Sequence, residues 1–516
     1  MIHTDRNRIV GFSPLDRTAK LKTYQTYIDG RWIDAASGKT FETCDPYTGQ
    51  PWALIPECDK VDVDQAVDAA SRAFERGPWP KMTPSARGKI MRRIAQLIEQ
   101  HAEHLGQVEV RDNGKLISEM VAQTKYMPEW FYYYGGLADK IQGTVVAVDR
   151  PNHFNYILRE PVGVCAFITP WNSPLMLTTW KLAPALAAGC TVVIKPSEYT
   201  SASLLEFVKL VIAESGLPPG VVNVVTGYGA LVGEPLVTHP RVAKVAFTGG
   251  STTGARVNEL AAKTFKKVSL ELGGKSPNIV FDDCIVDDAV SGAVSGIFAA
   301  TGQTCIAGSR LLLQETIHDR FVEKLVDMAK TAKLGDPALA ETQVGPVTTP
   351  PQYQKILSYI DIAKSEGAKC VLGGGAAPQE EGGGQYFVKP TIFTGVTNKM
   401  RIAQEEVFGP VLSVIKFKDE DEAVEIANDI AYGLGAGVWT QSLKRAHTMA
   451  GRIKAGTVWI NTYRAVSFLM PFGGYKASGL GRENGVEAID GYLQSKSVWI
   501  NNGPGGGNPF IMKTAS

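Results

Sequence analysis

The chain has 516 residues, which is too long for a single hydrophobic core and predicts either about three domains or a large two-domain protein with additions. Its charge is balanced, with 53 lysines and arginines against 52 aspartates and glutamates, so no overall field favours nucleic acid or an anionic membrane as a partner. No apolar run is long enough to span a bilayer. Specific contacts of individual side chains must therefore carry the function.

The cysteine pattern bears on the compartment and on metal binding. The seven cysteines are odd in number and scattered, which indicates free thiols in a reducing environment. No Cys-x-x-Cys or His-x-x-x-His spacing occurs, so we expect no metal site. The opening residues have no apolar core of the kind that a signal peptide requires. We therefore expect a cytoplasmic protein.

The N-terminal part predicts an arm and a hairpin. Residues 1 to about 20 are polar and are expected to form a loose arm. Residues 24–32 predict a hairpin that turns at Asp29-Gly30, because this pair readily supplies the positive φ of such turns.

Helices follow the hairpin. We expect one helix through Arg76 with Asp62 or Asp64 as its N-cap, and a second over 84–113 with apolar residues at helical spacing. The aromatic cluster at 130–134 has no flanking lysine or arginine. It therefore indicates helix-packing core and not a surface that stacks bases.

Between residues 162 and 272 the pattern changes to short apolar strands separated by helices. Near-continuous apolar strands that alternate with helices indicate a parallel sheet covered on both faces. This pattern predicts a Rossmann-like, nucleotide-binding α/β architecture. The predicted strands are 162–169, 191–195, 221–226, 242–247 and 267–272.

A second α/β series follows the first. We therefore expect two sheet domains, with Cys305 near the start of the second. The predicted strands at its two ends are 277–281 and 459–460. The predicted helices are at about 286–300, 317–333, 353–366, 419–429 and 443–453.

Two segments belong to neither sheet. Residues 143–148 and 155–159 alternate like a hairpin, and 494–500 is a late strand with no nearby partner in the sequence. Strands with such exposed edges are commonly covered by pairing across subunits, so we expect a homo-oligomer. The Gly-rich residues 503–507 are expected to be flexible.

Cys305 is the candidate nucleophile. It ends the small-residue stretch Phe298-Ala-Ala-Thr-Gly-Gln-Thr-Cys305, which we expect at the end of a helix. A lone free cysteine is usually a small buried hydrophobe. Here the small neighbours leave the sulfur approachable, and the Cys305 backbone amide can face negative charge that develops on a bound carbonyl. The chain must then also supply a base, a second oxyanion donor and an electron acceptor.

Several turns are candidate nucleotide contacts. Residues 247–254, Phe-Thr-Gly-Gly-Ser-Thr-Thr-Gly, follow a strand and open a helix, so pyrophosphate can approach the positive end of that helix. The motif is not Gly-x-Gly-x-x-Gly. A turn of this kind is as often a tight connection between a strand and a helix as it is a phosphate site, and the same two interpretations apply to residues 227–233. Lys195 and Glu198 offer the cation and the carboxylate that can bind a ribose diol. Without the other motifs, they would be interpreted as an ordinary solvated pair in a loop.

Glu271 and Asn172 are the candidates for the base and the second oxyanion donor. Glu271 is flanked by leucines, and two glycines follow the second leucine. Its side chain therefore lies either on a solvent-exposed face of the strand or half-buried, where its pKa would be raised as suits a general base. Asn172 follows a strand, at the usual rim of a ligand crevice, although an Asn before Ser-Pro is commonly a turn residue.

Over roughly residues 20–500 the chain closely resembles the aldehyde dehydrogenase superfamily. Each motif alone is weak, but all of them occur in family order. The matching motifs are Thr169-Pro-Trp-Asn172, Lys195-Pro-Ser-Glu198, Phe247-Thr-Gly-Gly250, Leu270-Glu-Leu-Gly-Gly274, Gly302-Gln-Thr-Cys305, Glu405-Glu-Val-Phe-Gly-Pro410 and Pro471-Phe-Gly-Gly-Tyr-Lys-Ala-Ser-Gly479.

The resemblance implies a mechanism. Cys305 adds as a thiolate to an aldehyde, while Asn172 and the Cys305 amide hold the oxyanion. Hydride then passes to the nicotinamide, and Glu271 activates the water that hydrolyses the thioester. The implied product is a carboxylic acid, with coenzyme A thioester formation less expected because Glu271 is present.

The resemblance also implies the domain organisation. It comprises a Rossmann-like NAD(P)-binding domain, a second α/β catalytic domain and a small β element that forms a homodimer or homotetramer. The implied ranges are 1–140 and 160–274 for NAD(P) binding, 275–480 for catalysis, 141–159 and 486–500 for oligomerisation, and 501–516 for a flexible tail.

The implied cofactor is NAD. Glu198 should repel a 2′-phosphate, but its side chain can swing away, so NADP is possible. Lys195 and Glu198 would take the adenosine ribose and Glu406 the nicotinamide ribose. Family members often have Ser where Gly250 stands, so one pyrophosphate contact is missing or comes from Ser251. The other implied contacts are Ile168, Thr169, Pro170, Trp171, Ser197, Gly229, Gly233, Phe247, Thr248, Leu272 and Phe408.

The implied partner is a small-molecule aldehyde in a largely apolar, roomy tunnel, which favours medium or bulky substrates. Arg464 either attracts an anionic semialdehyde or, more commonly for such a residue, forms a surface or intersubunit ion pair. The residues implied to line the tunnel are Ser173, Leu177, Trp180, Ala299, Thr304, Ile306 and the loop 464–472, which includes Arg464 and Phe472.

Two alternatives come from other functional classes. A catalytically silent binding or structural protein of the same fold would tolerate changes at Cys305, Glu271 and Asn172, yet all three residues are intact. A cysteine hydrolase would need no dinucleotide, and no histidine stands in a recognisable triad motif.

Overall fold

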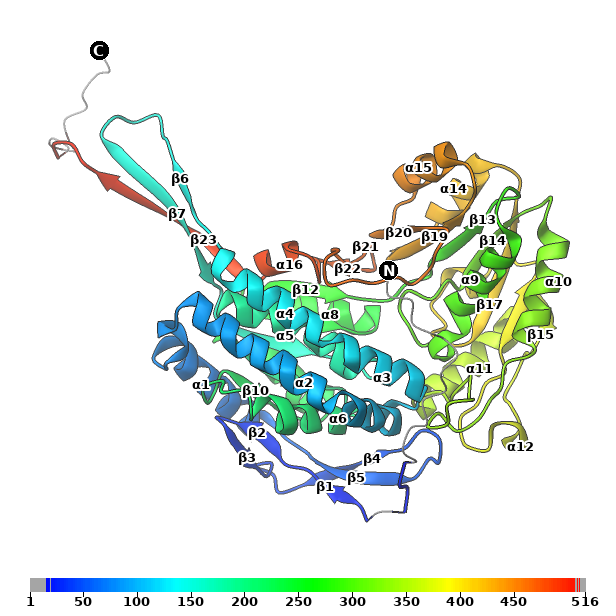
Figure 1. Ribbon diagram of the computed structural model, residues 1–516, viewed down its shortest axis with the longest axis horizontal. Helices are drawn as coiled ribbons and strands as arrows, with labels where there is room; N and C mark the ends of the chain where they lie inside the picture. Colours follow the sequence, from blue (N-terminus) through cyan, green and yellow to red (C-terminus); the bar gives the residue numbers. More distant parts are fainter. Residues whose placement is uncertain (1–14, 19, 506–507, 509, 511–516) are drawn as a thin grey trace.

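The structure is a computed structural model that describes residues 15–18, 20–505, 508 and 510. Two sheets flanked by helices stand side by side, and a thin arm of strands projects from the body (Figure 1). Most of the predicted N-terminal arm, and part of the predicted C-terminal tail, lie outside the described residues. Of the helices in the described ranges, none is long and apolar enough to cross a membrane.

The first sheet confirms the predicted Rossmann-like architecture. Its five central strands are parallel, and shorter antiparallel strands flank them on both sides. In spatial order the strands are β22 (Gly479–Leu480), β12 (Lys267–Glu271), β11 (Val242–Thr248), β8 (Val164–Ile168), β9 (Thr191–Lys195), β10 (Val222–Val224), β2 (Thr26–Ile28) and β3 (Arg31–Ile33).

The strand order creates a position for a ligand. The chain runs from β8 to β9 and β10 in one direction, and then crosses back to place β11 and β12 on the other side of β8. The connections diverge where β8 and β11 are neighbours. In parallel α/β sheets, ligands bind in the crevice at the carboxyl ends of the strands beside such a switch point.

Helices cover this sheet, and the aromatic cluster at 130–134 is core as predicted. Trp130, Phe131 and Tyr134 of α4 are fully buried, and α4 packs against α2 and α5 (Figure 1). The helices of this half are α1 (Lys60–Glu75), α2 (Pro84–Asn113), α3 (Ile117–Tyr126), α4 (Pro128–Leu137), α5 (Pro174–Ala188), α6 (Ser201–Phe207), α7 (Glu234–Thr238), α8 (Ser251–Ala262) and α16 (Glu487–Asp490).

The predicted N-cap of α1 is wrong. Asp59 caps the helix, because its carboxylate accepts the N–H of Val61 at 2.7 Å. Asp62 lies within the first turn and accepts the N–H of Asp59 at 2.9 Å, which completes a capping box. Asp64 instead pairs with Lys60 at 2.5 Å on the surface of the helix.

The second sheet is also mostly parallel, with one antiparallel edge strand. Its strands in spatial order are β15 (Lys369–Leu372), β16 (Thr391–Thr394), β17 (Val411–Phe417), β14 (Arg310–Gln314), β13 (Pro277–Val280), β19 (Gly435–Trp439) and β20 (Thr457–Ile460). The helices around it are α9 (Val286–Phe298), α10 (His318–Ala329), α11 (Pro350–Ser365), α12 (Gln379–Gly382), α13 (Arg401–Gln404), α14 (Glu420–Asn428) and α15 (Leu443–Arg452).

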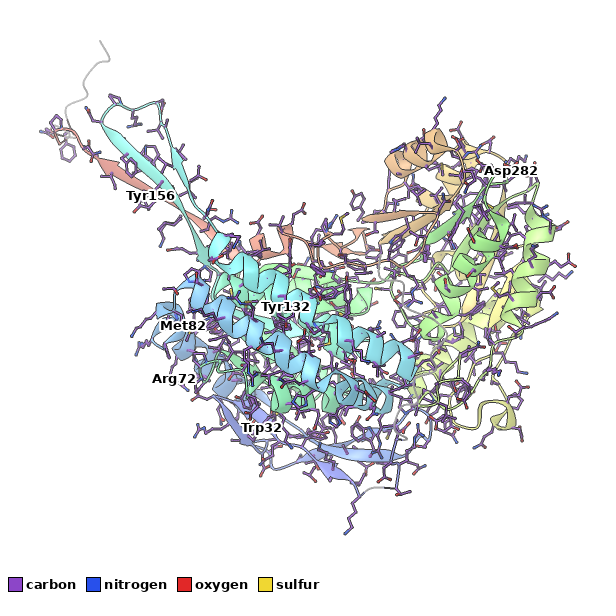
Figure 2. All side chains as sticks on the ribbon, viewed as in Figure 1. Trp32, Arg72, Met82, Tyr132, Tyr156 and Asp282 are labelled. Atoms are coloured by element: carbon purple, nitrogen blue, oxygen red, sulfur yellow. The ribbon has the colours of Figure 1, made fainter. Side chains whose placement is uncertain are left out.

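The projecting arm is a three-stranded antiparallel sheet. The predicted late strand, β23 (Leu493–Asn501), pairs along its length with β7 (His153–Pro161), which also pairs with β6 (Thr144–Val146). The late strand therefore finds its partner within the chain, far away in sequence. Tyr156 marks the arm in Figure 2, clear of the body. The outer edges of β6 and β23 have no partner strand among the described residues.

Short strands complete the fold. The predicted hairpin is confirmed as β2 and β3, which turn at Asp29 and Gly30, both with positive φ. A small sheet of β1 (Lys22–Thr23), β5 (Pro51–Pro56) and β4 (Thr40–Cys44) lies beside it (Figure 1). One further pair joins β18 (Tyr432–Gly433) to β21 (Tyr475–Lys476).

Candidate active site

Two of the predicted catalytic residues stand at the carboxyl edge of the first sheet. Asn172 follows β8 and precedes α5, and Glu271 is the last residue of β12. Both side chains are buried. Because β8 and β12 run parallel to each other through β11, both residues reach the same edge of the sheet, beside the switch point.

Cys305 is positioned by a loop with an uncommon backbone. Helix α9 ends at Phe298, two residues earlier than predicted, and Ala300 and Thr301 then both have a φ of 54°. Gly302 also has a positive φ, and a Cβ at this position would clash with the carbonyl of Gly409. These left-handed residues turn the chain sharply out of the helix, so Cys305 lies in the following loop.

Cys305, Asn172 and Glu271 meet in one cavity of about 180 Å³. The side-chain amide of Asn172 donates to the carbonyl oxygen of Gln303 at 3.2 Å, which fixes its orientation and leaves its second N–H free for a ligand. Within the described chain, no acceptor is bonded to the backbone N–H of Cys305. Two donors can therefore face a carbonyl oxygen bound beside the sulfur.

The thiol of Cys305 and the carboxyl of Glu271 are both shifted toward their neutral forms. Burial, together with the charges of Glu406 and Glu271, raises the pKa of the Cys305 thiol to about 12. Burial also raises the pKa of Glu271 well above its usual value, and the charge of Glu483 adds to this effect. Neither carboxylate oxygen of Glu271 has a hydrogen-bond partner among the described residues.

A buried ion pair behind Glu271 was not predicted from the sequence. The ammonium of Lys181 bonds the carboxylate of Glu483 at 2.5 Å and the hydroxyl of Thr248 at 2.6 Å. The charge of Lys181 partly offsets the rise in the pKa of Glu271. Lys181 lies within the otherwise apolar helix α5. A charged residue in an apolar helix is the one sequence signal that could have identified Lys181 as part of the site.

A larger crevice of about 370 Å³ shares residues with the catalytic cavity. Lys195 and Glu198 face each other there at 3.7 Å. The predicted cofactor residues that line this crevice are Ile168, Thr169, Pro170, Trp171, Lys195, Ser197, Glu198, Gly229, Gly233, Phe247, Thr248 and Gly250.

The crevice has the features that a dinucleotide requires. A Cβ added at Gly229 or Gly250 would meet no atom within 4 Å, so these glycines leave the space open. No side chain caps the N-terminus of α8, which follows Gly250, and its free N–H groups can bind phosphate. The hydroxyl of Thr169 is buried without a hydrogen-bond partner in the described chain, as is that of Ser251. These residues fit NAD.

The remaining predicted cofactor residues lie elsewhere. Leu272, Glu406 and Phe408 line the catalytic cavity instead of the crevice. Ser251 lines neither space and begins α8. Glu406 accepts the backbone N–H of Gly274 at 2.9 Å, which ties this carboxylate to the segment that follows Glu271.

Two residues of α11 also line the catalytic cavity and were not predicted. Gln352 donates to the carbonyl oxygens of Val407 at 2.8 Å and Phe408 at 3.1 Å, so it holds the segment that carries Phe408. Lys355 brings a cation close enough to lower the pKa of Glu406, which burial raises. Only the tertiary fold brings this helix to the site.

The predicted substrate residues form part of one hydrophobic cluster. Leu177, Trp180, Ile306 and Phe472 are buried in it, and the partly exposed Cys305 packs against it. The rings of Trp180 and Phe472 meet edge to face at 5.0 Å. Thr304 is partly exposed beside Cys305. Of the predicted substrate residues, only Leu177 lines the catalytic cavity itself.

Comparisons with known proteins show the family of the chain. The model of the aldehyde dehydrogenase family matches residues 32–498. The (Z)-2-((N-methylformamido)methylene)-5-hydroxybutyrolactone dehydrogenase of Acinetobacter baylyi is 46% identical over 496 residues, which cover 96% of this chain and 100% of that protein.

Solved structures match over nearly the whole chain. Aldehyde dehydrogenase from Bacillus cereus, solved as its NAD+ complex, is 45% identical with a TM-score of 0.91, covering 93% of this chain and 97% of that one. Betaine aldehyde dehydrogenase from Staphylococcus aureus, in complex with NAD+, is 42% identical with a TM-score of 0.93. The match covers 95% of this chain and 97% of that one.

Proposed function

The chain belongs to the aldehyde dehydrogenase family and oxidises aldehydes with NAD as the electron acceptor, and we propose that Cys305, Glu271 and Asn172 carry out this reaction. The observation that best supports these roles is that all three residues line one cavity, next to a crevice that fits the cofactor. No other cysteine lines that cavity. The product is a carboxylic acid.

Addition of the sulfur to the aldehyde requires a base. With a pKa of about 12, the Cys305 thiol is protonated at neutral pH, so its proton must leave as the sulfur attacks. Glu271 lies in the same cavity with both oxygens unpaired, and its ionised form takes that proton. A carbon–sulfur bond forms and the carbonyl oxygen becomes an oxyanion.

Asn172 and the Cys305 amide stabilise that oxyanion. The Asn172 side chain is already oriented by its bond to Gln303, so little reorganisation is needed when the charge develops. The donors favour the charged tetrahedral adduct over the neutral aldehyde, which lowers the barrier to hydride loss.

NAD, when bound, supplies a nicotinamide that accepts the hydride. Lys195 and Glu198 would hold the adenosine ribose, the free N–H groups of α8 would hold the pyrophosphate, and Glu406 would hold the nicotinamide ribose. The other members of the proposed set, including Ser251, Leu272 and Phe408, surround these contacts.

Glu271 also acts in the release of the product. Once the thioester has formed on Cys305, Glu271 loses to solvent the proton that it took from the thiol. Its carboxylate then takes a proton from water, and the resulting hydroxide oxygen attacks the thioester carbon. The carbon–sulfur bond breaks, the acid leaves, and the sulfur regains a proton. The same unpaired oxygens thus serve both halves of the reaction.

We assign NAD in preference to NADP on the basis of Glu198. Its carboxylate lies 3.7 Å from Lys195 and would repel a 2′-phosphate, although a rotated side chain would leave room for NADP. Comparing kcat/KM for the two cofactors in the parent protein and in Glu198→Gln tests the assignment. We expect a preference for NAD that narrows in the variant; a parent preference for NADP would refute it.

We further propose a homodimer or homotetramer built through the arm. The arm projects from the body with unpaired edges and exposed apolar side chains, which would otherwise promote aggregation. The exposed apolar residues are Val145, Val146, Phe154, Leu158, Trp499 and Ile500. Light scattering should give a dimer or tetramer for the parent and a smaller species for Val145→Asp with Trp499→Asp; a monomeric parent would refute this.

We propose a cytoplasmic location because all seven cysteines are free, as expected in a reducing compartment.

The substrates are aldehydes that the apolar cluster of Leu177, Trp180, Ile306 and Phe472 can accommodate. Purified protein with NAD and a panel of aldehydes should produce reduced nicotinamide. A catalytically silent protein of this fold, the alternative, would produce none with any of them.

A further inference from the structure

The backbone on either side of Arg464 is anchored, on one side to the residue that follows the nucleophile. The hydroxyl of Tyr463 donates at 3.0 Å to the carbonyl of Ile306, the residue after Cys305. The indole N–H of Trp459 donates at 2.8 Å to the carbonyl of Ala465. Between these anchors Arg464 has a φ of 65°, a conformation that a non-glycine residue keeps only where its surroundings impose it.

The charge of Arg464 is not neutralised within the described part of the chain. Its guanidinium forms no ion pair there, and its one hydrogen bond is from Nη1 to the carbonyl oxygen of Ser295 at 3.1 Å. A guanidinium carries five N–H donors, so most of them remain available to another acceptor. The side chain is also partly exposed, so a ligand can approach it.

A second cation lies nearby. The Lys115 side chain is 3% exposed, and its ammonium donates to the hydroxyl of Ser173 at 3.1 Å. Burial lowers the pKa of Lys115 to about 8, and the nearby charge of Arg464 contributes to that shift.

Two acidic residues lie near Lys115, and one of them, Glu109, is largely protonated at neutral pH because burial raises its pKa to about 8. Glu119 accepts the backbone N–H of Ala300 at 2.8 Å, its other carboxylate oxygen is buried without a partner in the described chain, and its charge raises the pKa of Lys115. Glu119 can balance Lys115. The charge of Arg464 then remains in excess.

The apolar cluster against which Cys305 packs also contains an unused donor. The indole N–H of Trp180 is buried without a hydrogen-bond partner among the described residues. Its ring stacks on Trp130 at 6.1 Å and meets Phe472 at 5.0 Å. Because a buried donor without a partner is unfavourable, an oxygen atom on a bound substrate would be stabilised there.

We propose that the enzyme prefers aldehydes that carry a carboxylate, and that Arg464 determines this specificity. The proposal rests on the assignment of Cys305 as the nucleophile. A carboxylate can accept two parallel N–H bonds from a guanidinium, which gives both attraction and orientation. The same excess charge disfavours aldehydes with a quaternary ammonium group, so a role in oxidising betaine aldehyde is not expected for this chain.

A matched pair of substrates tests the proposal. 4-Oxobutanoate and its methyl ester have the same aldehyde and chain, and differ in the charged group. For the parent we expect kcat/KM to favour the carboxylate by about tenfold or more, and for Arg464→Met we expect this ratio to fall close to one. Arg452→Met is the control, because Arg452 pairs with Asp421 on the surface and should leave the ratio unchanged.

Each other outcome has a definite meaning. If the parent shows no preference, or if Arg464→Met keeps the parent ratio, the proposal is overturned. If Arg464→Met changes the oligomeric state but not the ratio, Arg464 forms an intersubunit contact and the proposal is again wrong. The proposed function is tested separately, because oxidation of the methyl ester by NAD requires only the catalytic residues.

Discussion

The two sheets meet at one site, but they position their functional residues in different ways. The first sheet presents Asn172 and Glu271 at the carboxyl ends of parallel strands, where the topology alone brings them together. The second half presents Cys305 and Glu406 on loops, held by left-handed backbone and by contacts with Gly274 and Gly409. Side-chain changes in the first group should therefore alter chemistry alone, whereas backbone changes in the second should also alter folding.

The largest effect is expected from Cys305→Ala. Removing the nucleophile should lower kcat by about 10⁴-fold or more while leaving NAD binding intact, because the cofactor crevice does not include Cys305. Cys284→Ala is the control, since Cys284 is partly buried against a hydrophobic cluster of the second half and does not line the catalytic cavity. The measurement is the rate of NADH formation at saturating aldehyde. Comparable losses in both variants would contradict the special role of Cys305.

Glu271→Gln should slow release of the product more than addition of the sulfur, because a thiol loses its proton to solvent more readily than water does. The substitution keeps the shape of the side chain but removes the base, so steady-state turnover should fall by about 10²- to 10⁴-fold. Rapid-mixing measurements of NADH should then resolve a first turnover followed by slow release. The roles assigned to Glu271 would be wrong if the variant kept the steady-state rate of the parent.

Asn172→Ala removes one oxyanion donor. We expect kcat to fall by about a hundredfold, with little change in the Kd for NAD, because the lost interaction forms in the transition state. The circular dichroism and thermal unfolding of the variant should match those of the parent closely. A change confined to KM would instead mean that Asn172 serves only in binding.

Gly302→Ala tests the backbone of the second group. A side chain here would clash with the carbonyl of Gly409 and would strain a φ of 68°, so the free energy of unfolding should fall by about 2 kcal/mol or more. Gly451→Ala is the matched control, because a Cβ there meets no atom within 4 Å and helix α15 favours alanine. Chemical denaturation compares the two; equal stabilities would contradict the argument.

The smallest expected effect is on the pH dependence of turnover, which tests the role of Glu271 in the first sheet. A carboxyl acts as a base only when it is ionised, and burial raises the pKa of Glu271. Turnover by the parent should therefore fall severalfold as the pH drops through that raised pKa, and this acid limb should be absent from Glu271→Gln. An identical acid limb in both proteins would assign it to another group.

Much of the fold follows from the sequence because strand and helix periods are local signals. Helix α2, for example, has the predicted bounds of Pro84 and Asn113, since Thr83 caps one end and Gly114, with a positive φ, ends the other. The cap of α1 was misassigned because three aspartates lie within six residues, and only the path of the chain decides which one becomes the cap.

The site was less accessible to sequence reasoning where tertiary contacts decide. The strand ends marked Asn172 and Glu271, and the family motifs marked Cys305 and Glu406. Gln352 and Lys355 gave no such signal, because α11 is an ordinary amphipathic helix whose position at the cavity depends on the packing of the second sheet. The partner of β23 was equally hidden, since β7 lies more than 300 residues away in sequence.

The most direct test of the central claim is the intact mass of Glu271→Gln after mixing with NAD and an aldehyde. The account predicts a covalent acyl group, because the thioester forms but is released slowly, and peptide mapping should locate it on Cys305. An unmodified protein that had nevertheless formed NADH, or an acyl group on another cysteine, would contradict the account.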